Sequence, residues 1–400
     1  MKIAINGFGR IGRAAYRAAQ ANPREFGERL RRSTRIDAND IEVVAVNDLG
    51  DKEQLANLLK YDSVYGVADA DIEIAEPATA EDADNYAEGA EKNLIINGKS
   101  IPFFSEKDPT KLPWGDLDVD VVLECTGVFA DFEKSQAHID AGAKKVIISA
   151  NAKGDGPTVV LGTESARRLF EDPAEGKPTQ GKTSEVSTDL PAGKAGLTSE
   201  VGELGRLGNI VSNASCTTNC ISPIMQILDD TFGVEKALMT TDHAYTSTQN
   251  LVDGPSRKDL RRARAAGVNT IPTTTGSAKA TGKVVTNLEG KFDGIAIRVP
   301  VPCGSISDVV AVLEKDVTAE EINKVFKEAA ESEEYKGIID YSEEPLVSTD
   351  IIGNPYSAVF DAPFTRVVGG NLVKILAWYD NEWAYANRLV ELAQIINSSL

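Results

Sequence analysis

Residues 2–12 read Lys-Ile-Ala-Ile-Asn-Gly-Phe-Gly-Arg-Ile-Gly, and this stretch decides the class of fold. Residues 2–6 predict a short apolar strand, and an alanine-rich helix is expected over residues 13–21. A Gly-x-Gly-x-x-Gly turn lies between them, formed by Gly7, Gly9 and Gly12. Such a turn lets the backbone approach a pyrophosphate at the helix N-terminus. The setting therefore predicts a dinucleotide site on a Rossmann-type fold.

A second strand, predicted over residues 41–46, runs into Asp48. In this kind of fold an acidic residue after the glycine turn accepts hydrogen bonds from the adenosine ribose hydroxyls, and we expect that role for Asp48. Its charge favours NAD over NADP because it repels a 2′-phosphate. The usual gap is about 20 residues, so residues 24–40 are predicted to extend the first crossover. A role for their arginines near the adenine end of the site is the alternative.

Strands and helices alternate through the first part of the chain. Residues 75–91 form an acidic, alanine-rich segment within helical and polar stretches, and further strands are predicted over residues 119–124 and 145–149. This alternation is typical of a parallel, doubly wound sheet, so the predicted fold class is α/β. Four strand ends should line one cofactor cleft: Asn6, Asp48, Thr126 and Ser149.

The composition is that of a globular chain with an acidic surface. The 400 residues suggest two or three domains, and 42% are hydrophobic. A net charge of −19 disfavours binding to nucleic acids and to anionic membranes. The chain shows neither a long apolar run nor a signal peptide, so we expect a cytoplasmic protein. Its cysteines form no Cys-x-x-Cys pair, and we interpret them as reduced thiols: Cys125, Cys216, Cys220 and Cys303.

Residues 209–220 read Asn-Ile-Val-Ser-Asn-Ala-Ser-Cys-Thr-Thr-Asn-Cys and place Cys216 between a strand and a helix. Apolar residues at helical spacing follow, and Gly233 is the expected stop. At the positive end of a helix a thiol should lose its proton more easily than an ordinary cysteine. Cys216 is therefore a candidate nucleophile. A small buried thiol in a helix cap is the alternative.

A cysteine nucleophile needs a base, and the chain has only two histidines. His138 lies in a mixed polar stretch and is predicted to be exposed on a helix. His243 ends an apolar strand and is the predicted base, with a structural histidine as the alternative. A thiolate–imidazole pair beside a nicotinamide implies oxidation of an aldehyde through a covalent hemithioacetal and a thioester. Phosphate or water would then release the acyl group.

Seven motifs in one order give the chain a family resemblance. It resembles phosphorylating glyceraldehyde-3-phosphate dehydrogenase over nearly its whole length, except residues 24–40 and roughly 168–206. The motifs are Asn-Gly-Phe-Gly-Arg-Ile-Gly-Arg at 6–13, Asn-Asp-Leu at 47–49, Ser-Asn-Ala-Ser-Cys-Thr-Thr-Asn-Cys at 212–220, His-Ala-Tyr-Thr at 243–246, Thr-Thr-Thr-Gly at 273–276, Arg-Val-Pro at 298–300 and Trp-Tyr-Asp-Asn-Glu-Trp at 378–383.

The resemblance implies a role for each residue of the site. Cys216 would carry the acyl group, and His243 would act as its base and activator. The substrate's own phosphate would be held by Thr246, Thr248 and Arg298, although a structural salt bridge is the alternative for Arg298. Inorganic phosphate would bind at Ser215, Thr217, Thr275 and Gly276. Asn381 would hold the nicotinamide carboxamide, and the rest of the NAD site would be Gly7, Gly9, Arg10, Ile11, Gly12, Asp48, Thr126 and Ser149. No metal is expected.

The resemblance also implies the domain organisation. A Rossmann-type NAD-binding domain would span 1–215, with insertions at about 24–40 and 168–206. An α+β catalytic domain with a mixed or antiparallel sheet would span 216–380, and a C-terminal helix at 381–400 would return to the first domain. A homotetramer is implied, with the basic run 257–264 packed between subunits. The polar residues 171–206 are predicted to be an exposed insertion without a part in the chemistry.

Two other functions stay open at this point. One is a sister dehydrogenase acting on erythrose 4-phosphate, which shares the cysteine–histidine chemistry. The other is a non-catalytic binding protein that uses the fold as a scaffold. The intact Cys216–His243 pair and the negative net charge speak against the scaffold.

Overall fold

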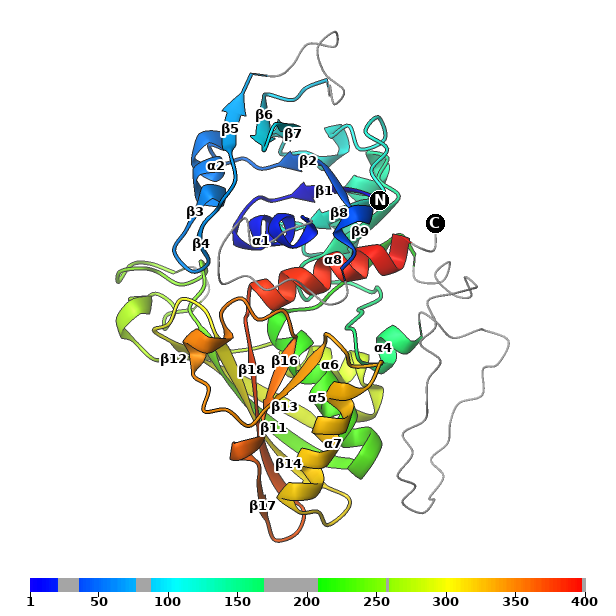
Figure 1. Ribbon diagram of the computed structural model, residues 1–400, viewed down its shortest axis with the longest axis vertical. Coiled ribbons are helices and arrows are strands. Elements are labelled where there is room, and N and C mark those ends of the chain that lie inside the picture. Colours follow the sequence, from blue (N-terminus) through cyan, green and yellow to red (C-terminus); the bar gives the residue numbers. More distant parts are fainter. Residues whose placement is uncertain (21–35, 77–87, 169–207, 257–258, 398–400) are drawn as a thin grey trace, which may run out of the picture.

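The computed structural model describes residues 1–20, 36–76, 88–168, 208–256 and 259–397. They form two large sheets with a long C-terminal helix between them, and a small two-stranded sheet (Figure 1). No helix in these ranges is long and apolar enough to cross a membrane. The predicted insertion at 171–206 lies outside the described residues, as does most of the basic-rich part of the first crossover.

The first sheet has the strand order β10-β9-β8-β1-β2-β7-β6-β5. Its strands are β1 (Lys2–Asn6), β2 (Glu42–Asn47), β5 (Ile72–Ala75), β6 (Lys92–Ile96), β7 (Lys99–Phe104), β8 (Val121–Glu124), β9 (Lys145–Ile148) and β10 (Ile210–Ser212). Neighbours from β10 to β7 are parallel, as predicted. The helices of this part are α1 (Arg10–Ala19), α2 (Lys52–Lys60), α3 (Phe132–Asp140) and α4 (Glu164–Arg167), and β3 (Tyr61–Asp62) pairs with β4 (Gly66–Val67).

The sheet departs from the predicted parallel arrangement at one edge. Strands β5, β6 and β7 pair in antiparallel fashion. The turn between β6 and β7 is Asn97-Gly98, and both residues have positive φ, 49° and 80°. That backbone geometry closes a tight hairpin, which reverses the chain without a crossover helix.

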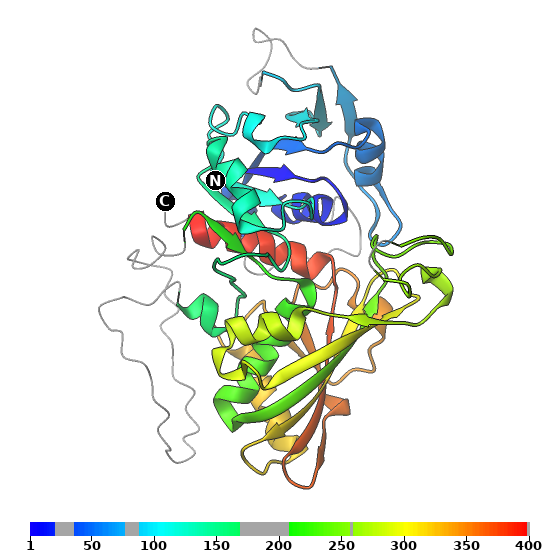
Figure 2. The ribbon, with the colours of Figure 1, turned by 180° about the vertical axis from the view of Figure 1, so that it is seen from behind.

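The second sheet has the order β12-β13-β11-β14-β18-β16-β15, and β17 pairs with β18. Its strands are β11 (Val234–Ala244), β12 (Ile271–Thr274), β13 (Phe292–Val299), β14 (Ser305–Leu313), β15 (Ile339–Ser342), β16 (Ala358–Asp361), β17 (Arg366–Val368) and β18 (Leu372–Tyr379). The sheet is mixed, because β11–β13 and β15–β16 are parallel and the other pairs are antiparallel. Helices α5 (Cys216–Phe232), α6 (Ser277–Val284) and α7 (Ala319–Glu331) accompany it (Figure 2).

Local signals account for several helix ends. Ser215 caps α5 by accepting from the Thr218 N–H, and Gly233 ends it with φ 73°. Thr318 and Glu321 form the predicted capping box of α7. Helix α1 begins at Arg10, three residues earlier than predicted.

Helix α8 (Trp383–Asn397) returns from the second sheet and packs against α1 of the first (Figure 1). Buried residues of both sheets and of α8 belong to one continuous apolar cluster. The chain therefore leaves β18 and enters α8 at the contact between the two parts. The boundaries predicted at residues 215 and 380 stay a prediction; the first coincides with the cap of α5 and the second with the end of β18.

Candidate active site

Cys216 is the first residue of α5 and is half-buried. His243 lies near the end of β11 and is buried. The Sγ atom of Cys216 is 3.4 Å from Nε2 of His243. The fold thus brings together the two residues that were predicted from the sequence to be the nucleophile and the base.

The predicted low pKa of Cys216 is wrong for this structure. Burial raises the pKa of the thiol above its ordinary value. Three effects act in the opposite direction: the Arg298 guanidinium, the Thr217 hydroxyl and the backbone N–H groups at the start of α5. They do not outweigh the loss of hydration around a thiolate, because an ion loses more solvation energy on burial than a neutral thiol.

Arg298 lies opposite His243 on the neighbouring strand β13. Its Nη1 is 2.6 Å from His243 Nδ1 and donates to the Ala244 carbonyl oxygen at 3.0 Å. His243 Nδ1 also lies 2.6 Å from that carbonyl oxygen. Burial, and next the positive charge of Arg298, lower the pKa of His243 to about 3. The imidazole is therefore neutral at physiological pH, with one ring nitrogen protonated and the other able to accept a hydrogen bond.

Tyr379 also contacts this part of the site, next to Cys216 and His243. No role was predicted for it from the sequence. Its ring meets His243 edge-on, with centroids 6.0 Å apart. Its hydroxyl bonds Thr217 Oγ1 at 2.8 Å and Thr241 Oγ1 at 2.9 Å. Tyr379 therefore fixes the imidazole by packing. Its place in the Trp-Tyr-Asp-Asn-Glu-Trp motif was the available signal.

Of the residues expected to hold the substrate's phosphate, Thr246 and Thr248 lie just beyond β11, and Arg298 lies on β13. Thr246 Oγ1 bonds Thr248 Oγ1 at 2.9 Å, and Thr248 is exposed. The Nε of Arg298 is buried and has no hydrogen-bond partner among the described residues. A buried guanidinium with an unused donor fits an anion.

The residues expected to hold inorganic phosphate come from two helix starts. Ser215 Oγ lies 3.2 Å from Ser277 Oγ, to which Thr275 Oγ1 donates at 3.0 Å. Gly276 caps α6 and is exposed, with no side-chain cap bond. Thr217 differs from the others, since its hydroxyl is occupied by Tyr379 in a buried position.

The glycine turn has the close contacts that a dinucleotide site needs. A Cβ on Gly7, which has φ +95°, would meet the Thr126 backbone N at 2.6 Å, and one on Gly12 would meet the Gly7 carbonyl oxygen at 2.0 Å. Beside Gly9 there is open space, and no side chain caps α1 at this residue. The first N–H groups of α1, including those of Arg10 and Ile11, are thus available to an anion. The turn fits a pyrophosphate.

The other expected cofactor residues surround that turn. Asp48 accepts from the Phe8 N–H at 2.6 Å and from the Gly50 N–H at 2.7 Å, at the end of β2. Thr126 donates through its backbone N–H to Glu124 at 2.8 Å, and Ser149 follows the neighbouring strand β9. The three residues follow the ends of β2, β8 and β9 at one edge of the parallel part of the sheet, as the sequence predicted.

Asn381 lies between β18 and α8 and is buried. Its side-chain oxygen accepts from the Gly304 N–H at 3.2 Å and from the Ser305 hydroxyl at 2.9 Å. These contacts leave the amide NH₂ group without an acceptor among the described residues. That group fits a carboxamide oxygen.

The prediction that His138 is exposed is wrong. It is fully buried in α3, where Trp114 Nε1 donates to its Nδ1 at 3.1 Å and its Nε2 faces Glu124 at 3.2 Å. Glu124 also accepts from Asn6 at 2.5 Å and holds Thr126. His138 therefore supports the strand ends beneath the glycine turn and takes no part in a proton transfer with Cys216.

Two family models match this chain. The model of the glyceraldehyde 3-phosphate dehydrogenase NAD binding domain matches residues 1–132, and that of the C-terminal domain of the same enzyme matches residues 215–381. The chain belongs to the glyceraldehyde-3-phosphate dehydrogenase family.

Relatives bearing that family name match along the whole chain. Glyceraldehyde-3-phosphate dehydrogenase 2 of Streptomyces avermitilis is 44% identical over 400 residues, which cover 100% of this chain and 99% of the relative. The glyceraldehyde-3-phosphate dehydrogenases of Mycobacterium avium and Geobacillus stearothermophilus are each 45% identical, over 400 and 398 residues, covering 100% of this chain and 99% and 98% of theirs. The family resemblance stated from seven motifs is confirmed, and NAD is the cofactor of the N-terminal domain.

Proposed function

We propose that the chain catalyses the phosphorylating oxidation of D-glyceraldehyde 3-phosphate to 1,3-bisphosphoglycerate with NAD. The observation that carries this proposal is the Cys216–His243 pair, with Sγ and Nε2 3.4 Å apart, in a chain of this family. Cys216 attacks the aldehyde carbon and forms a hemithioacetal. The Cys216 backbone N–H and the imidazole of His243 stabilise the oxyanion.

His243 takes the hydroxyl proton of the hemithioacetal as the carbon is oxidised. Bound NAD supplies the acceptor for the hydride. A thioester on Cys216 remains, and inorganic phosphate attacks it to release the acyl phosphate and restore the thiolate. In this step His243 holds the proton that the hydroxyl gave up.

The position of Arg298 gives the imidazole two possible proton arrangements. If Nδ1 accepts from Arg298, Nε2 carries the proton and can only donate to sulfur. If Nδ1 donates to the Ala244 carbonyl oxygen, Nε2 is free to accept a proton from Cys216. A substrate phosphate that draws the guanidinium away from Nδ1 favours the second arrangement. Arg298 would then couple substrate binding to the base.

An assay of NADH formation tests the function. The wild-type chain is expected to reduce NAD with glyceraldehyde 3-phosphate only when inorganic phosphate is present. Erythrose 4-phosphate, run in parallel, decides between this function and that of the sister dehydrogenase. Cys216→Ser is the matched control for background reduction. Equal rates with and without phosphate would contradict the proposal.

We also propose that the chain forms a homotetramer. The second sheet carries exposed apolar side chains that share one face: Leu238, Ile295, Val310 and Leu372. The loop after β11 exposes Leu251, Val252, Leu260 and Val268 as well. A second copy of the chain would cover these residues and remove them from water. Light scattering at micromolar concentration that returned only monomer would defeat this part of the proposal. Cytoplasmic location and the absence of nucleic-acid partners stay predictions.

A further inference from the structure

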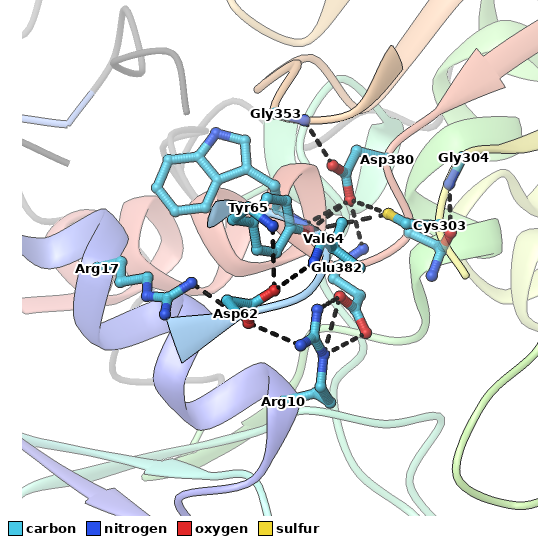
Figure 3. A network of polar contacts seen from close by, with 12 residues as sticks. Arg10, Arg17, Asp62, Val64, Tyr65, Cys303, Gly304, Gly353, Asp380 and Glu382 are labelled. Carbon is cyan, nitrogen blue, oxygen red and sulfur yellow. Dashed lines mark hydrogen bonds and ion pairs between the residues drawn. The ribbon is translucent and has the colours of Figure 1, made fainter. Parts of the chain in front are cut away.

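The side chain of Arg10 lies between two carboxylates where α1, β3 and α8 meet (Figure 3). Its Nε is 2.9 Å and 3.1 Å from the two carboxylate oxygens of Glu382, and its Nη2 donates to Glu382 as well. Its Nη1 donates to Asp62 at 2.7 Å, and the guanidinium carbon lies 5.6 Å from the centre of the Tyr65 ring. The guanidinium thus forms its hydrogen bonds with the carboxylates of Glu382 and Asp62. Arg10 would therefore contribute to the pyrophosphate site through its backbone N–H group and not through its side chain.

This pair joins the pyrophosphate part of the proposed NAD site to its nicotinamide part. Arg10 is the first residue of α1, where the glycine turn would hold the pyrophosphate. Glu382 directly follows Asn381, which would hold the nicotinamide carboxamide. The two residues are 372 positions apart in the chain. A bidentate arginine–carboxylate pair fixes direction as well as distance, because two parallel hydrogen bonds define one plane.

Asp380 holds Asn381 from the other side. One carboxylate oxygen accepts from the Tyr65 hydroxyl at 3.0 Å and from the Cys303 thiol at 3.1 Å. The same oxygen accepts from the backbone N–H groups of Glu382 and Trp383 at 2.9 Å and 2.8 Å. The second oxygen accepts from the Gly353 N–H at 2.8 Å. Asp380 is fully buried, so this anchor cannot shift without leaving buried donors unpaired.

Asn381 is therefore held between a rigid anchor and an ion pair that reaches the glycine turn. Loss of Asp380 would disturb the fold, because its donors come from several elements. Loss of the Glu382 charge would release only the connection to α1. A substitution at Glu382 can therefore test the positioning of Asn381 without disturbing the fold.

We propose that Arg10 and Glu382 form a positioning pair, which sets the orientation of the Asn381 carboxamide relative to the glycine turn. The inference rests on the proposed NAD site. Its consequence is that the pair determines how the nicotinamide ring is presented, and has little effect on how tightly the dinucleotide binds. Orientation matters for the rate because a misplacement of about 1 Å can cost on the order of 100-fold.

The test compares Glu382→Gln with the wild-type chain. The variant keeps the side chain's size and removes its charge. We expect the single-turnover rate of NADH formation to fall by about tenfold or more, and the dissociation constant of NAD to change by less than about threefold. Transferred nuclear Overhauser effects between the nicotinamide protons and the ribose H1′ should show one ring orientation in the wild-type complex and a mixture in the variant.

Glu334→Gln is the matched control. Arg167 contacts Glu334 at 2.6 Å, Asp230 at 3.0 Å and the Tyr335 hydroxyl at 3.2 Å, which repeats the surroundings of Arg10 away from the cofactor turn. This variant should leave both the rate and the ring orientation unchanged. In the double variant Arg10→Gln, Glu382→Gln the rate should be no lower than in the worse single variant, because each single substitution already removes the Arg10–Glu382 interaction.

Three results would overturn the pair's role. They are an unchanged ring orientation in Glu382→Gln, a loss of NAD affinity with an unchanged transfer rate, and a fall in rate and affinity in proportion to a lowered melting temperature. A wild-type chain that binds NAD but forms no NADH from glyceraldehyde 3-phosphate would contradict the proposed function alone. The Overhauser comparison would still decide the role of Arg10 and Glu382. A wild-type chain that does not bind NAD would overturn both.

Discussion

Nη1 of Arg298 lies 2.6 Å from Nδ1 of His243, the imidazole nitrogen that faces away from Cys216. The contact ties the proposed substrate-phosphate residue to the proposed base across two neighbouring strands. Arg298 acts on both proposed catalytic groups: its positive charge opposes the burial that raises the pKa of Cys216, and it adds to the burial that lowers the pKa of His243. Substitutions at these three positions should therefore give different pH profiles.

Replacement of the nucleophile or the base should separate their contributions. Cys216→Ser is expected to abolish dehydrogenase activity, since no other described thiol faces His243. His243→Asn should reduce kcat by on the order of 10²–10⁴-fold, because the imidazole also activates the thiol. Circular dichroism should show an intact fold in both. A Cys216→Ser chain retaining more than about one per cent of wild-type kcat would contradict the assignment.

The reactivity of Cys216 should depend on pH in a direction set by burial. Because the pKa of the thiol is raised, iodoacetamide should inactivate the free enzyme faster as the pH rises beyond the range of an ordinary thiol. Arg298→Gln should move this profile to still higher pH, since it removes a positive charge near the sulfur. Inactivation rates measured across a pH series report both effects. A profile centred below that of free cysteine would show that the helix N-terminus outweighs burial.

The depressed pKa of His243 should also appear in acid stability. In the unfolded chain an ordinary histidine binds a proton below about pH 6.5, whereas the folded chain holds His243 neutral down to about pH 3. The unfolded state therefore binds more protons in this window, and the free energy of unfolding falls as the pH drops through it. Urea midpoints should decline less between pH 6.5 and 4 in His243→Asn than in the wild-type chain. An equal decline of the urea midpoint in the two chains would contradict a buried, neutral His243 imidazole.

The cluster beneath the glycine turn should contribute to stability. His138→Ala leaves the Trp114 indole N–H and one side of Glu124 without their buried partner, which should cost about 1–3 kcal/mol in the free energy of unfolding. Gln136→Ala changes an exposed residue of the same helix and is the control. Urea denaturation of both variants provides the comparison. Equal midpoints would mean that the buried network is not needed.

Asp48 should determine the preference for NAD over NADP. Its carboxylate stands beside the glycine turn, and the side chain of the neighbouring exposed Leu49 has no donor for a 2′-phosphate. We expect NAD to be preferred over NADP, and Asp48→Asn to narrow the ratio of kcat/KM for the two cofactors. Steady-state assays with both cofactors give that ratio. Comparable values in the wild-type chain would point to the arginines of the first crossover.

Local rules of the chain were enough to predict much of the fold and of the site. Strand β1 and the glycine turn follow from apolar spacing and three glycines, and the ends of α5 and α7 follow from capping residues. The positions of Cys216 and His243 at element ends were predicted in the same way. These signals act between residues a few positions apart, so a single sequence carries them. The Asn97-Gly98 turn is a signal of the same local kind, but the hairpin at the sheet edge was not predicted from it.

Burial and distant pairing were decided only by the tertiary structure. The helix that carries His138 has mixed composition, and only its packing against Trp114 and Glu124 places the imidazole inside. The raised pKa of Cys216 reflects the solvation lost to surrounding segments, which a helix N-terminus alone does not reveal. Arg10 and Glu382 meet across 372 positions, and no local pattern links them. Desolvation and ion pairing depend on what surrounds a group in space, and that is fixed only when the two sheets and α8 pack together.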